Sequence, residues 1–302
     1  MKVFACPAFS LAKKIAKKLN AKFSGIEIKY FPDNEIYLRF KERVDEEVIL
    51  VQSLAKKPNE RLVELIFSSL TAKDLGARKV IAVIPYLAYM RQDKRFKKGE
   101  CISARVLAEI LQASEIDALF TLNPHLHRIK SLSEIYRIPA FELSCEGEIA
   151  KYIQKKFSKD EWVLVGPDIE STNFVRRISR ISGFDHFILR KRRISSKKVK
   201  IFVSKLKPSK KNAIIIDDIL STGETLIKTI KELKKLGFRK FFCIVVHLLS
   251  EKGLKKVEKF CKVVSTNSVP SRVSKIDVSE VFSLAIKRYL TEKPIREIDE
   301  LF

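Results

Sequence analysis

Short apolar runs alternate with longer amphipathic segments along the whole chain. The runs are bounded by turn residues and lie at 48–51, 80–84, 118–122, 162–165, 213–216 and 241–246. Uninterrupted apolar runs of this length predict strands that are covered on both faces of a parallel sheet. Between them, apolar residues recur at helical spacing in 61–75, 103–111, 149–157, 225–236 and 279–290. The alternation predicts an α/β protein with mainly parallel central sheets flanked by helices.

The strand signals divide into two halves of similar size, near residues 141–147. A chain of 302 residues can bury more than one core. We therefore expect an N-terminal domain over residues 1–143 and a C-terminal domain over residues 144–287, with residues 288–302 as a candidate helix that completes the first domain. Residues 190–211 are rich in Lys, Arg and Ser, with a strand signal only at 199–203, and predict a mobile basic flap.

Composition narrows the class of protein. The chain has 60 Lys and Arg against 36 Asp and Glu, a net charge of +24, which favours polyanionic partners such as nucleic acid, nucleotides or sugar phosphates. The lysines are spread over nearly every expected helix, which argues against nucleic acid as the main partner. The chain contains no run of about 18 apolar residues, so the sequence predicts no membrane-spanning helix. The five cysteines lack Cys-x-x-Cys spacing, and we interpret them as buried thiols of a soluble cytoplasmic protein.

The strongest chemical signal is the sequence Ala-Ile-Ile-Ile-Asp-Asp-Ile-Leu-Ser-Thr-Gly-Glu-Thr at 213–225. It reads as a strand, two acids and a hydroxyl-rich turn before a helix, which places Asp217 and Asp218 at the carboxyl edge of a sheet, where α/β proteins bind ligands. Backbone N–H groups, hydroxyls and the helix N-terminus can surround one phosphate. The pattern predicts a site for a phosphorylated ribose. The simpler alternative is that the acids end a strand and Ser221 caps a helix.

This pattern resembles the phosphoribosyl-diphosphate motif of the phosphoribosyltransferase superfamily, which has two acids, two apolar residues and then x-Thr-Gly-x-Thr. Most members have one domain, whereas this chain has another α/β half before the motif. That half contains Tyr-Phe-Pro-Asp-Asn-Glu-Ile at 30–36 and Val-Ile-Pro-Tyr-Leu-Ala-Tyr-Met-Arg-Gln-Asp-Lys at 83–94, which resemble the ribose-phosphate pyrophosphokinase family. The resemblance continues to Ile-Asp-Val-Ser-Glu-Val-Phe at 276–282 and so covers essentially the full length.

The resemblance implies two stacked phosphoribosyltransferase-like domains and a reaction in which the diphosphate of Mg-ATP passes to the 1-hydroxyl of ribose 5-phosphate. The products are phosphoribosyl pyrophosphate and AMP, and the cofactor is Mg²⁺. Family members assemble from paired subunits, so we expect a homo-oligomer of at least two copies. The resemblance assigns ribose 5-phosphate binding to Asp217, Asp218, Ser221, Thr222, Gly223, Glu224 and Thr225.

ATP needs a different site, because the chain has no Gly-x-x-x-x-Gly-Lys-Ser/Thr loop. In the resembled family, Phe31 stacks on adenine, Asp33 and Glu35 bond its edge, and a second segment binds adenosine and phosphates, often across a subunit boundary. That second segment is Arg91, Gln92 and Asp93. Taken singly, Phe31 also fits a core aromatic residue and 91–93 a polar surface turn.

The resemblance also implies metal and catalytic residues. His125 and Asp168, each after an expected strand, match positions that bind magnesium and substrate phosphates, although a lone histidine there is more often structural. Lys191 and Arg193 match the cations of a catalytic loop that closes over the phosphates, and such cations stabilise the charge of the transition state. A solvated basic loop without chemistry is the alternative.

Three positions depart from the commoner bacterial pattern of the family. Ser221 replaces a third acid, Asn123 replaces an acid before His125, and Glu170-Ser171 stands in place of Gly-Gly. The first two resemble archaeal members. Three alternative functions stay open: a catalytically silent regulatory homologue, a nucleotide-responsive regulator on the same fold, and a phosphoribosyltransferase that uses a base.

Overall fold

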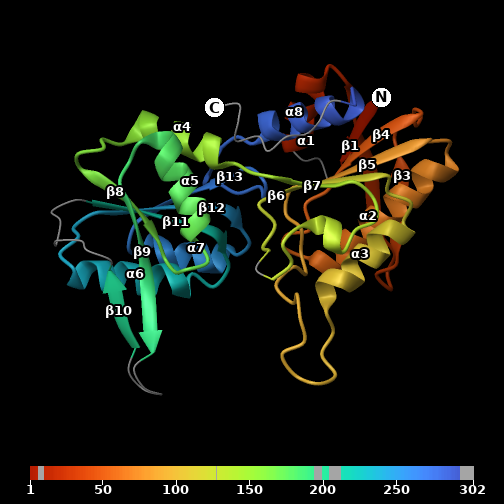
Figure 1. Cartoon of the computed structure of the whole chain (residues 1–302). Helices are drawn as coiled ribbons and strands as arrows, with labels where there is room; N and C mark the ends of the chain where they lie inside the picture. The colour runs from red at the N-terminus through yellow and green to blue at the C-terminus, as the bar shows by residue number, and fades with distance from the viewer. Residues whose placement is uncertain (6–9, 127, 194–198, 204–211, 293–302) are drawn as a thin grey trace. The chain divides into compact units, whose positions relative to one another are not determined.

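The computed structural model describes residues 1–5, 10–126, 128–193, 199–203 and 212–292 (Figure 1). These residues form two compact units. The first contains residues 1–144 and 268–270 together with the last helix, α8, and the second contains residues 145–267 and 271–277. Each unit is built around one seven-stranded sheet.

The sheet of the first unit has the strand order β3-β2-β1-β4-β5-β6-β7. All neighbours are parallel except β2 and β3, which form an antiparallel hairpin. The strands are β1 (Lys2–Ala5), β2 (Lys22–Tyr30), β3 (Ile36–Phe40), β4 (Glu47–Val51), β5 (Lys79–Ile84), β6 (Ala118–Leu122) and β7 (Ala140–Leu143). Residues 80–84 are fully buried, as expected for a central strand covered on both faces.

The helices of the first unit are α1 (Ser10–Leu19), α2 (Pro58–Asp74), α3 (Ser103–Ala113), the short 3-10 helix η1 (Leu132–Glu134) and α8 (Ser279–Leu290). Right-handed crossovers place α1 on one face of the sheet and α2 and α3 on the other. Helix α8 packs against α1 and β7, and the Tyr289 ring lies 5.7 Å from that of Phe120. The helix that returns to this unit therefore begins at Ser279, earlier than the expected segment 288–302, of which residues 293–302 lie outside the described residues.

The second unit repeats the same strand order, as β10-β9-β8-β11-β12-β13-β14. Its strands are β8 (Trp162–Gly166), β9 (His186–Arg193), β10 (Val199–Val203), β11 (Asn212–Leu220), β12 (Phe241–Leu248), β13 (Lys262–Thr266) and β14 (Ser274–Ile276). Its helices are α4 (Glu146–Lys156), α5 (Thr172–Ser182), α6 (Glu224–Lys235) and α7 (Glu251–Glu258). Again only one pair, β9 and β10, is antiparallel. The prediction of an α/β fold with two mainly parallel sheets is confirmed.

The strand signal at 199–203 is confirmed by β10, whereas the start of the expected basic flap, residues 190–193, proved to be strand. Strand β9 continues to Arg193, and β10 returns beside it, with Lys191 paired to Ile201 and Arg193 to Val199. The pair occupies the same place in its sheet as the β2–β3 hairpin does in the first sheet. Residues 194–198 and 204–211 of the expected flap lie outside the described residues.

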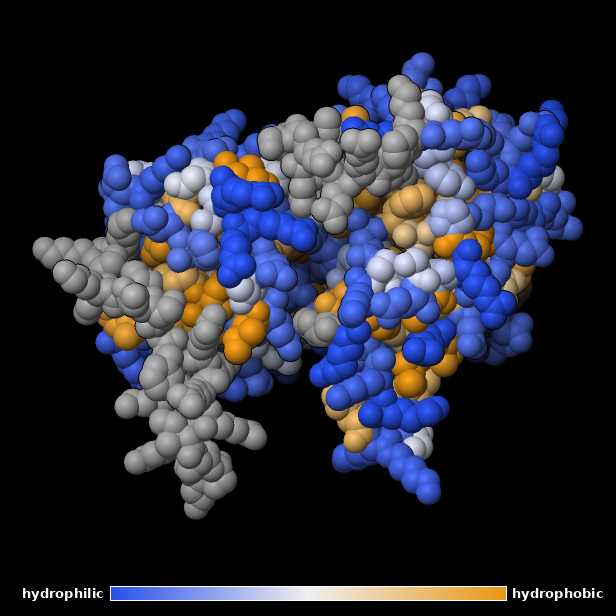
Figure 2. Space-filling model, in the orientation of Figure 1, coloured by the Kyte–Doolittle hydropathy of each residue, from blue (hydrophilic) through white to orange (hydrophobic). Residues whose placement is uncertain are grey.

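The surface is rich in charge, and hydrophilic residues cover most of the face seen in Figure 2. Within the described ranges, no helix has both the length and the apolar character needed to cross a membrane. The interpretation of the cysteines as buried thiols needs correction. Cys145 and Cys243 are buried, but Cys101 is exposed and Cys261 is half-buried; Cys6 lies outside the described residues.

Candidate active site

The order of the second sheet reverses between β8 and β11. The chain leaves β8 toward β9 on one side and leaves β11 toward β12 on the other, which makes this the topological switch point where α/β proteins bind ligands. Strand β8 pairs with β11 only as far as Ile215, whereas β11 continues beside β12 to Leu220. Asp217 and Asp218 therefore lie where β11 has passed the end of β8, and Asp168 lies in the turn that follows β8.

These three carboxyl groups influence one another. The pKa of Asp217 is raised well above its ordinary value, first because burial withdraws the carboxyl group from water, and then because the charges of Asp218 and Asp168 are close. The N–H of Asp218 donates to Asp217 Oδ1 at 3.1 Å, which partly offsets this effect. No Lys or Arg side chain of the described residues forms an ion pair with Asp217. The site thus concentrates negative charge that a ligand donor or a cation would relieve.

The turn after β11 leads directly into helix α6. Gly223 occupies the N-cap position in the left-handed region, with φ of 79°, and no side chain caps the helix. Helix α6 therefore starts at Glu224, and Ser221 is not its cap, contrary to the simpler alternative. Thr222 Oγ1 accepts only a long bond, 3.4 Å, from the N–H of Glu224.

The first turn of α6 keeps donors for a ligand. In the part of the chain that the structure describes, the N–H groups of Thr225 and Leu226 have no hydrogen-bond partner. Uncapped N–H groups and the positive end of the helix dipole together favour an anion. Glu224 does not block this end, because its carboxylate is exposed and lies 3.9 Å from Lys228, one turn along the helix.

Helix α7 packs directly against the turn at Ser221–Gly223. A Cβ atom on Gly253 would lie 1.8 Å from the carbonyl oxygen of Ser221, and one on Gly223 would lie 2.7 Å from a methyl group of Val257. The turn and the helix are therefore in direct backbone contact, which only glycine at 253 permits. Ser250 Oγ fixes the start of α7 by accepting from the N–H of Gly253 at 3.0 Å. The motif-based prediction missed Gly253, since it lies in another segment of the sequence.

The Asp168 turn is held by the residue that replaces the second glycine of the family pattern. Ser171 donates from Oγ to the carbonyl of Asp168 at 2.7 Å, and its N–H donates to Asp168 Oδ1 at 3.2 Å. Its side chain occupies space that Gly166 leaves, because a Cβ there would lie 2.4 Å from Ser171 Oγ. Glu170 is exposed. The Ser171 substitution thus stabilises the turn that carries Asp168.

Lys191 and Arg193 approach the same edge of the sheet through β9. Gly166, the last residue of β8, pairs with Ile188, so positions 189–193 extend beyond the end of β8, where Asp168 lies. The two basic positions are two residues apart in one strand and therefore share a face of it. The structure does not describe their side chains.

The expected adenine residues lie together in the β2–β3 turn. The N–H of Phe31 donates to the carbonyl of Glu35 at 2.8 Å, and Asp33 Oδ1 accepts from the N–H of Glu35 at 3.1 Å. The Phe31 ring is 52% exposed and contacts Tyr37 edge-on, with centroids 6.4 Å apart. The alternative that Phe31 is a core aromatic residue is therefore excluded.

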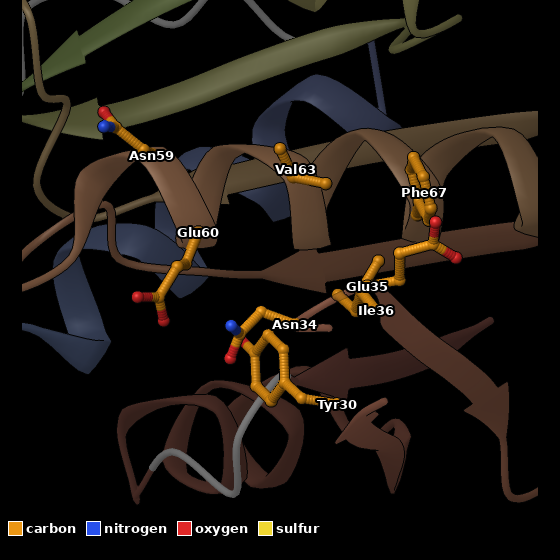
Figure 3. Close-up of a pocket in the computed structure, with 8 residues that line it drawn as sticks. All are labelled: Tyr30, Asn34, Glu35, Ile36, Asn59, Glu60, Val63 and Phe67. Carbon is orange, nitrogen blue, oxygen red and sulfur yellow. The ribbon is translucent and has the colours of Figure 1, made fainter. Parts of the chain in front are cut away.

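A cavity of about 530 Å³ lies between this turn and helix α2 (Figure 3). The hairpin contributes Tyr30, Asn34, Glu35 and Ile36, and α2 contributes Asn59, Glu60, Val63 and Phe67. Tyr30 donates from its hydroxyl to the buried Glu64 at 2.9 Å. Burial first, and then this bond, raise the pKa of Tyr30 to about 12, so it stays a neutral donor. Of the expected ATP residues, only Glu35 lines the cavity.

The second expected ATP segment, residues 91–93, lies after β5, and its three side chains have different surroundings. Asp93 is buried and accepts from Arg128, through the backbone N–H at 3.1 Å and the guanidinium at 3.0 Å. Gln92 bonds the carbonyl of Lys94 and the carboxylate of Glu100. Arg91 is exposed and makes no ion pair within the described residues. Asp93 therefore anchors the loop internally, while Arg91 is available to a ligand.

The two ATP segments follow strands that are not neighbours in the first sheet. Strands β2 and β5 are separated by β1 and β4, so their ends lie three strand spacings apart, roughly 14 Å. His125 follows β6 in the first unit, two residues after Asn123, whose φ of 39° suits asparagine in the left-handed region. His125 and Asp168 belong to different units.

The carboxylates at the switch point suit a metal ion that is held jointly by the protein and by substrate phosphates, rather than by protein side chains alone. Over the described ranges, no three His, Cys, Asp or Glu side chains are placed so that they can hold a metal ion by themselves. Carboxylates at the switch point are nevertheless the hard oxygen ligands that Mg²⁺ prefers, and Mg²⁺ is commonly held by one or two carboxylates together with substrate phosphates.

Comparison with known proteins agrees with this geometry. Residues 1–114 match the model of the N-terminal domain of ribose phosphate pyrophosphokinase, and residues 131–281 match that of the phosphoribosyl transferase domain. The protein is thus of the class built from two phosphoribosyltransferase-type domains. Its fold is shared by the phosphoribosylpyrophosphate synthetase of Mycobacterium smegmatis, with a TM-score of 0.84 and 20% identity over 96% of this chain and 99% of that one.

Two archaeal relatives extend the similarity over nearly the whole length. The ribose-phosphate pyrophosphokinase of Methanothermobacter thermautotrophicus is 37% identical over 289 residues, which covers 94% of this chain and 99% of the relative. That of Pyrococcus furiosus is 35% identical over 272 residues, which covers 88% and 94%. The chain belongs to the ribose-phosphate pyrophosphokinase family.

The raised pKa of Asp217 predicts that this residue lowers stability at neutral pH. Below the pKa of the unfolded chain the carboxyl group is protonated in both states and costs nothing. As the pH rises above that value, the unfolded chain ionises more readily, so the free energy of unfolding falls. We expect Asp217→Asn to raise the free energy of unfolding by about 1–2 kcal/mol at pH 7, with a gain that shrinks toward zero near pH 4.

Urea unfolding at several pH values measures this gain. Asp160→Asn, at an exposed position of the same unit, is the matched control and should leave stability unchanged at every pH. A pH-independent gain for Asp217→Asn, or a loss at pH 7, would contradict the electrostatic origin.

Proposed function

We propose that the protein transfers the diphosphate of ATP to the 1-hydroxyl of ribose 5-phosphate, which yields phosphoribosyl pyrophosphate and AMP. The 1-hydroxyl oxygen attacks the β-phosphorus, the bond from that phosphorus to the bridging oxygen of the α-phosphate breaks, and the hydroxyl proton passes to solvent. The observation that carries the proposal is the switch point of the second sheet, where tandem aspartates adjoin a helix N-terminus with unbonded N–H groups.

Ribose 5-phosphate has two features that this site matches. Its phosphate suits the turn from Ser221 to Thr225, where donors converge and the helix dipole is positive. Its 2- and 3-hydroxyls suit Asp217 and Asp218, whose carboxylate oxygens are hydrogen-bond acceptors at the end of β11. The raised pKa of Asp217 supports this role, since a donor there stabilises its ionised form.

ATP binding is proposed for the first unit. Exposed Phe31 offers an aromatic face for adenine, and the neighbouring Asp33 and Glu35 offer acceptors for its amino group. Arg91 and Gln92 are proposed for the phosphates and ribose. Asp93 is proposed as a positioning residue, because its carboxylate already binds Arg128.

The separation of the two ATP segments supports an assembly of at least two copies. Strands β2 and β5, which precede Phe31 and Arg91, are three strand spacings apart, and a second copy that brings its own segment to one of them would complete the site. The half-exposed apolar residues Val63 and Phe67, beside the cavity in Figure 3, supply surface for such a contact. The substrates and the unpaired thiols fit a cytoplasmic enzyme.

Asp168 in the second unit and His125 in the first are each proposed as a single protein ligand of Mg²⁺, with the phosphates of ATP supplying further ligands. Bound there, the ion neutralises phosphate charge during transfer. Lys191 and Arg193 are proposed as the cations that contact the transferred diphosphate, because β9 carries both past the carboxyl edge of the sheet. Cations that bind more tightly in the transition state than in the ground state raise kcat.

The central test is incubation with ATP, ribose 5-phosphate and Mg²⁺, followed by chromatography. We expect AMP and phosphoribosyl pyrophosphate in equal amounts, and no AMP when ribose 5-phosphate or Mg²⁺ is omitted. Binding of the substrates without AMP release would indicate a silent homologue or a regulator instead. AMP formation that needs phosphoribosyl pyrophosphate and adenine would indicate a phosphoribosyltransferase that uses a base.

The same assay, repeated at decreasing protein concentration, tests the shared site. Specific activity should fall as the copies separate, and light scattering on the same samples should show the loss of mass. Constant activity of a monomer would refute the second-copy part of the proposal and leave the reaction itself untouched.

Gly253→Ala is expected to weaken ribose 5-phosphate binding. The added Cβ would displace the Ser221 carbonyl and with it the phosphate turn, so KM for ribose 5-phosphate should rise about 10-fold while KM for ATP stays within about 2-fold. Alanine otherwise favours a helix over glycine, so the change should not arise from loss of α7. Gly25→Ala, where nothing lies within 4 Å, is the control. If the two variants have the same KM for ribose 5-phosphate, the contact of Gly253 with the turn does not contribute to binding of this substrate.

Lys191→Ala is expected to lower kcat about 100-fold or more, with the dissociation constant for ATP changed less than about 3-fold, because the cation acts in the transition state. Steady-state kinetics and equilibrium binding separate the two effects. Lys200→Ala, on the paired strand at the register position of Arg192, is the control. A matching loss of ATP affinity and kcat would place Lys191 in the ground-state site instead.

A further inference from the structure

Two cysteines that are distant in sequence lie side by side in the second unit. The Sγ atoms of Cys243 and Cys261 are 3.3 Å apart. The register explains this contact: Cys243 in β12 pairs with Val263 in β13, and Cys261 lies two residues before Val263, on the same side of the sheet. No other pair of the described cysteines is in contact.

The two thiols differ in their surroundings. Cys243 is fully buried in the core of the second unit, whereas Cys261 is half-buried at the turn after α7 and can meet small reagents. The hydrogen bond with Cys261, and then burial, raise the pKa of Cys243 well above its ordinary value, so this residue stays a thiol. One sulfur is accessible to an oxidant and the second is in contact with it, so Cys243 lies where it can displace the oxygen of an oxidised Cys261.

We propose that Cys243 and Cys261 form a redox-active dithiol, which closes to an intramolecular disulfide on oxidation by a peroxide. The Cys261 thiolate attacks one peroxide oxygen, so an S–O bond forms, the O–O bond breaks and hydroxide leaves. The Cys243 sulfur then attacks Cys261, the S–S bond forms, the S–O bond breaks, and the hydroxyl group leaves with the Cys243 proton as water. The two thiols lose two electrons, and the peroxide gains them.

The distance that the two sulfurs must close is short. A disulfide requires the sulfurs to close from 3.3 Å to about 2.05 Å, and Cys261 lies in a turn outside β13, where its backbone is not held by the sheet ladder. The bond would tie the turn after α7 to the central strand β12. Cys261 is also joined to α7 through its N–H, which donates to the carbonyl of Val257 at 3.2 Å. Oxidation would therefore change the contacts at the C-terminal end of α7, the helix that also packs against the Ser221 turn.

The test uses the full chain, treated with hydrogen peroxide under native conditions and then alkylated and digested. We expect a disulfide-linked peptide that joins Cys243 to Cys261, a mass loss of about 2 Da before alkylation, and full reversal by dithiothreitol. Cys261→Ser, a conservative change at a half-buried position, should abolish the linked peptide, and Cys243→Ala gives a second variant on the buried side.

Cys101→Ser is the matched control, because Cys101 is exposed and has no cysteine neighbour within the described residues. This variant should keep the linked peptide. Recovery of Cys243 and Cys261 as alkylated thiols, under conditions that oxidise Cys101, would overturn the proposal. So would disulfides that join separate chains through Cys261 in place of the internal bond. Neither result depends on whether the protein makes phosphoribosyl pyrophosphate.

Discussion

Three carboxyl groups, those of Asp168, Asp217 and Asp218, are brought together at one edge of the second sheet, and among the described side chains no Lys or Arg forms an ion pair with Asp217. The arrangement is unfavourable for the isolated protein, since burial and mutual repulsion raise the pKa of Asp217. The backbone holds the acids in this place. Strand β11 pairs with β12 as far as Leu220, whereas its pairing with β8 stops at Ile215, so Asp217 and Asp218 lie beyond the end of β8. A ligand that supplies hydroxyl donors, or a cation, would relieve this repulsion, which is consistent with the ribose 5-phosphate site that we propose here.

The repetition of one strand order in the two units explains how the remaining groups are placed. In both sheets the antiparallel hairpin lies at the same edge, and in both it carries residues that we propose for binding the phosphoryl donor. In the first unit the hairpin turn presents an exposed aromatic ring and two acids, and in the second the hairpin strand presents two basic positions. In the proposed function, the same architectural element thus serves once for a base and once for phosphates. In the second unit, β11 carries Asp217 and Asp218, and the uncapped helix α6 follows it directly. The groups proposed for the sugar and for its phosphate therefore lie on adjoining elements.

Support for the site comes from residues that have no chemistry of their own. Gly253 allows α7 to touch the Ser221 carbonyl, Ser171 holds the Asp168 turn, and Arg128 holds Asp93. The cysteine pair lies at the far end of α7, so the same helix links the phosphate turn to a pair of thiols. Geometry at the site therefore depends on contacts between segments that are far apart in the sequence.

The sequence by itself determined the alternation of strands and helices, the two mainly parallel sheets, and the phosphate turn with its paired acids. These features depend on local properties: burial on both faces demands an apolar run, and a turn into a helix N-terminus demands glycine and hydroxyl residues in a short span. Resemblance extended the prediction to Phe31 and Lys191, although not to the strand that contains Lys191. Only the tertiary structure decided that Asp93 is buried against Arg128, that Ser221 is not a helix cap, that α8 returns to the first unit, and that Cys243 meets Cys261. Each of these depends on which distant segments pack together, and a local pattern of residues contains no information about its partner across the fold.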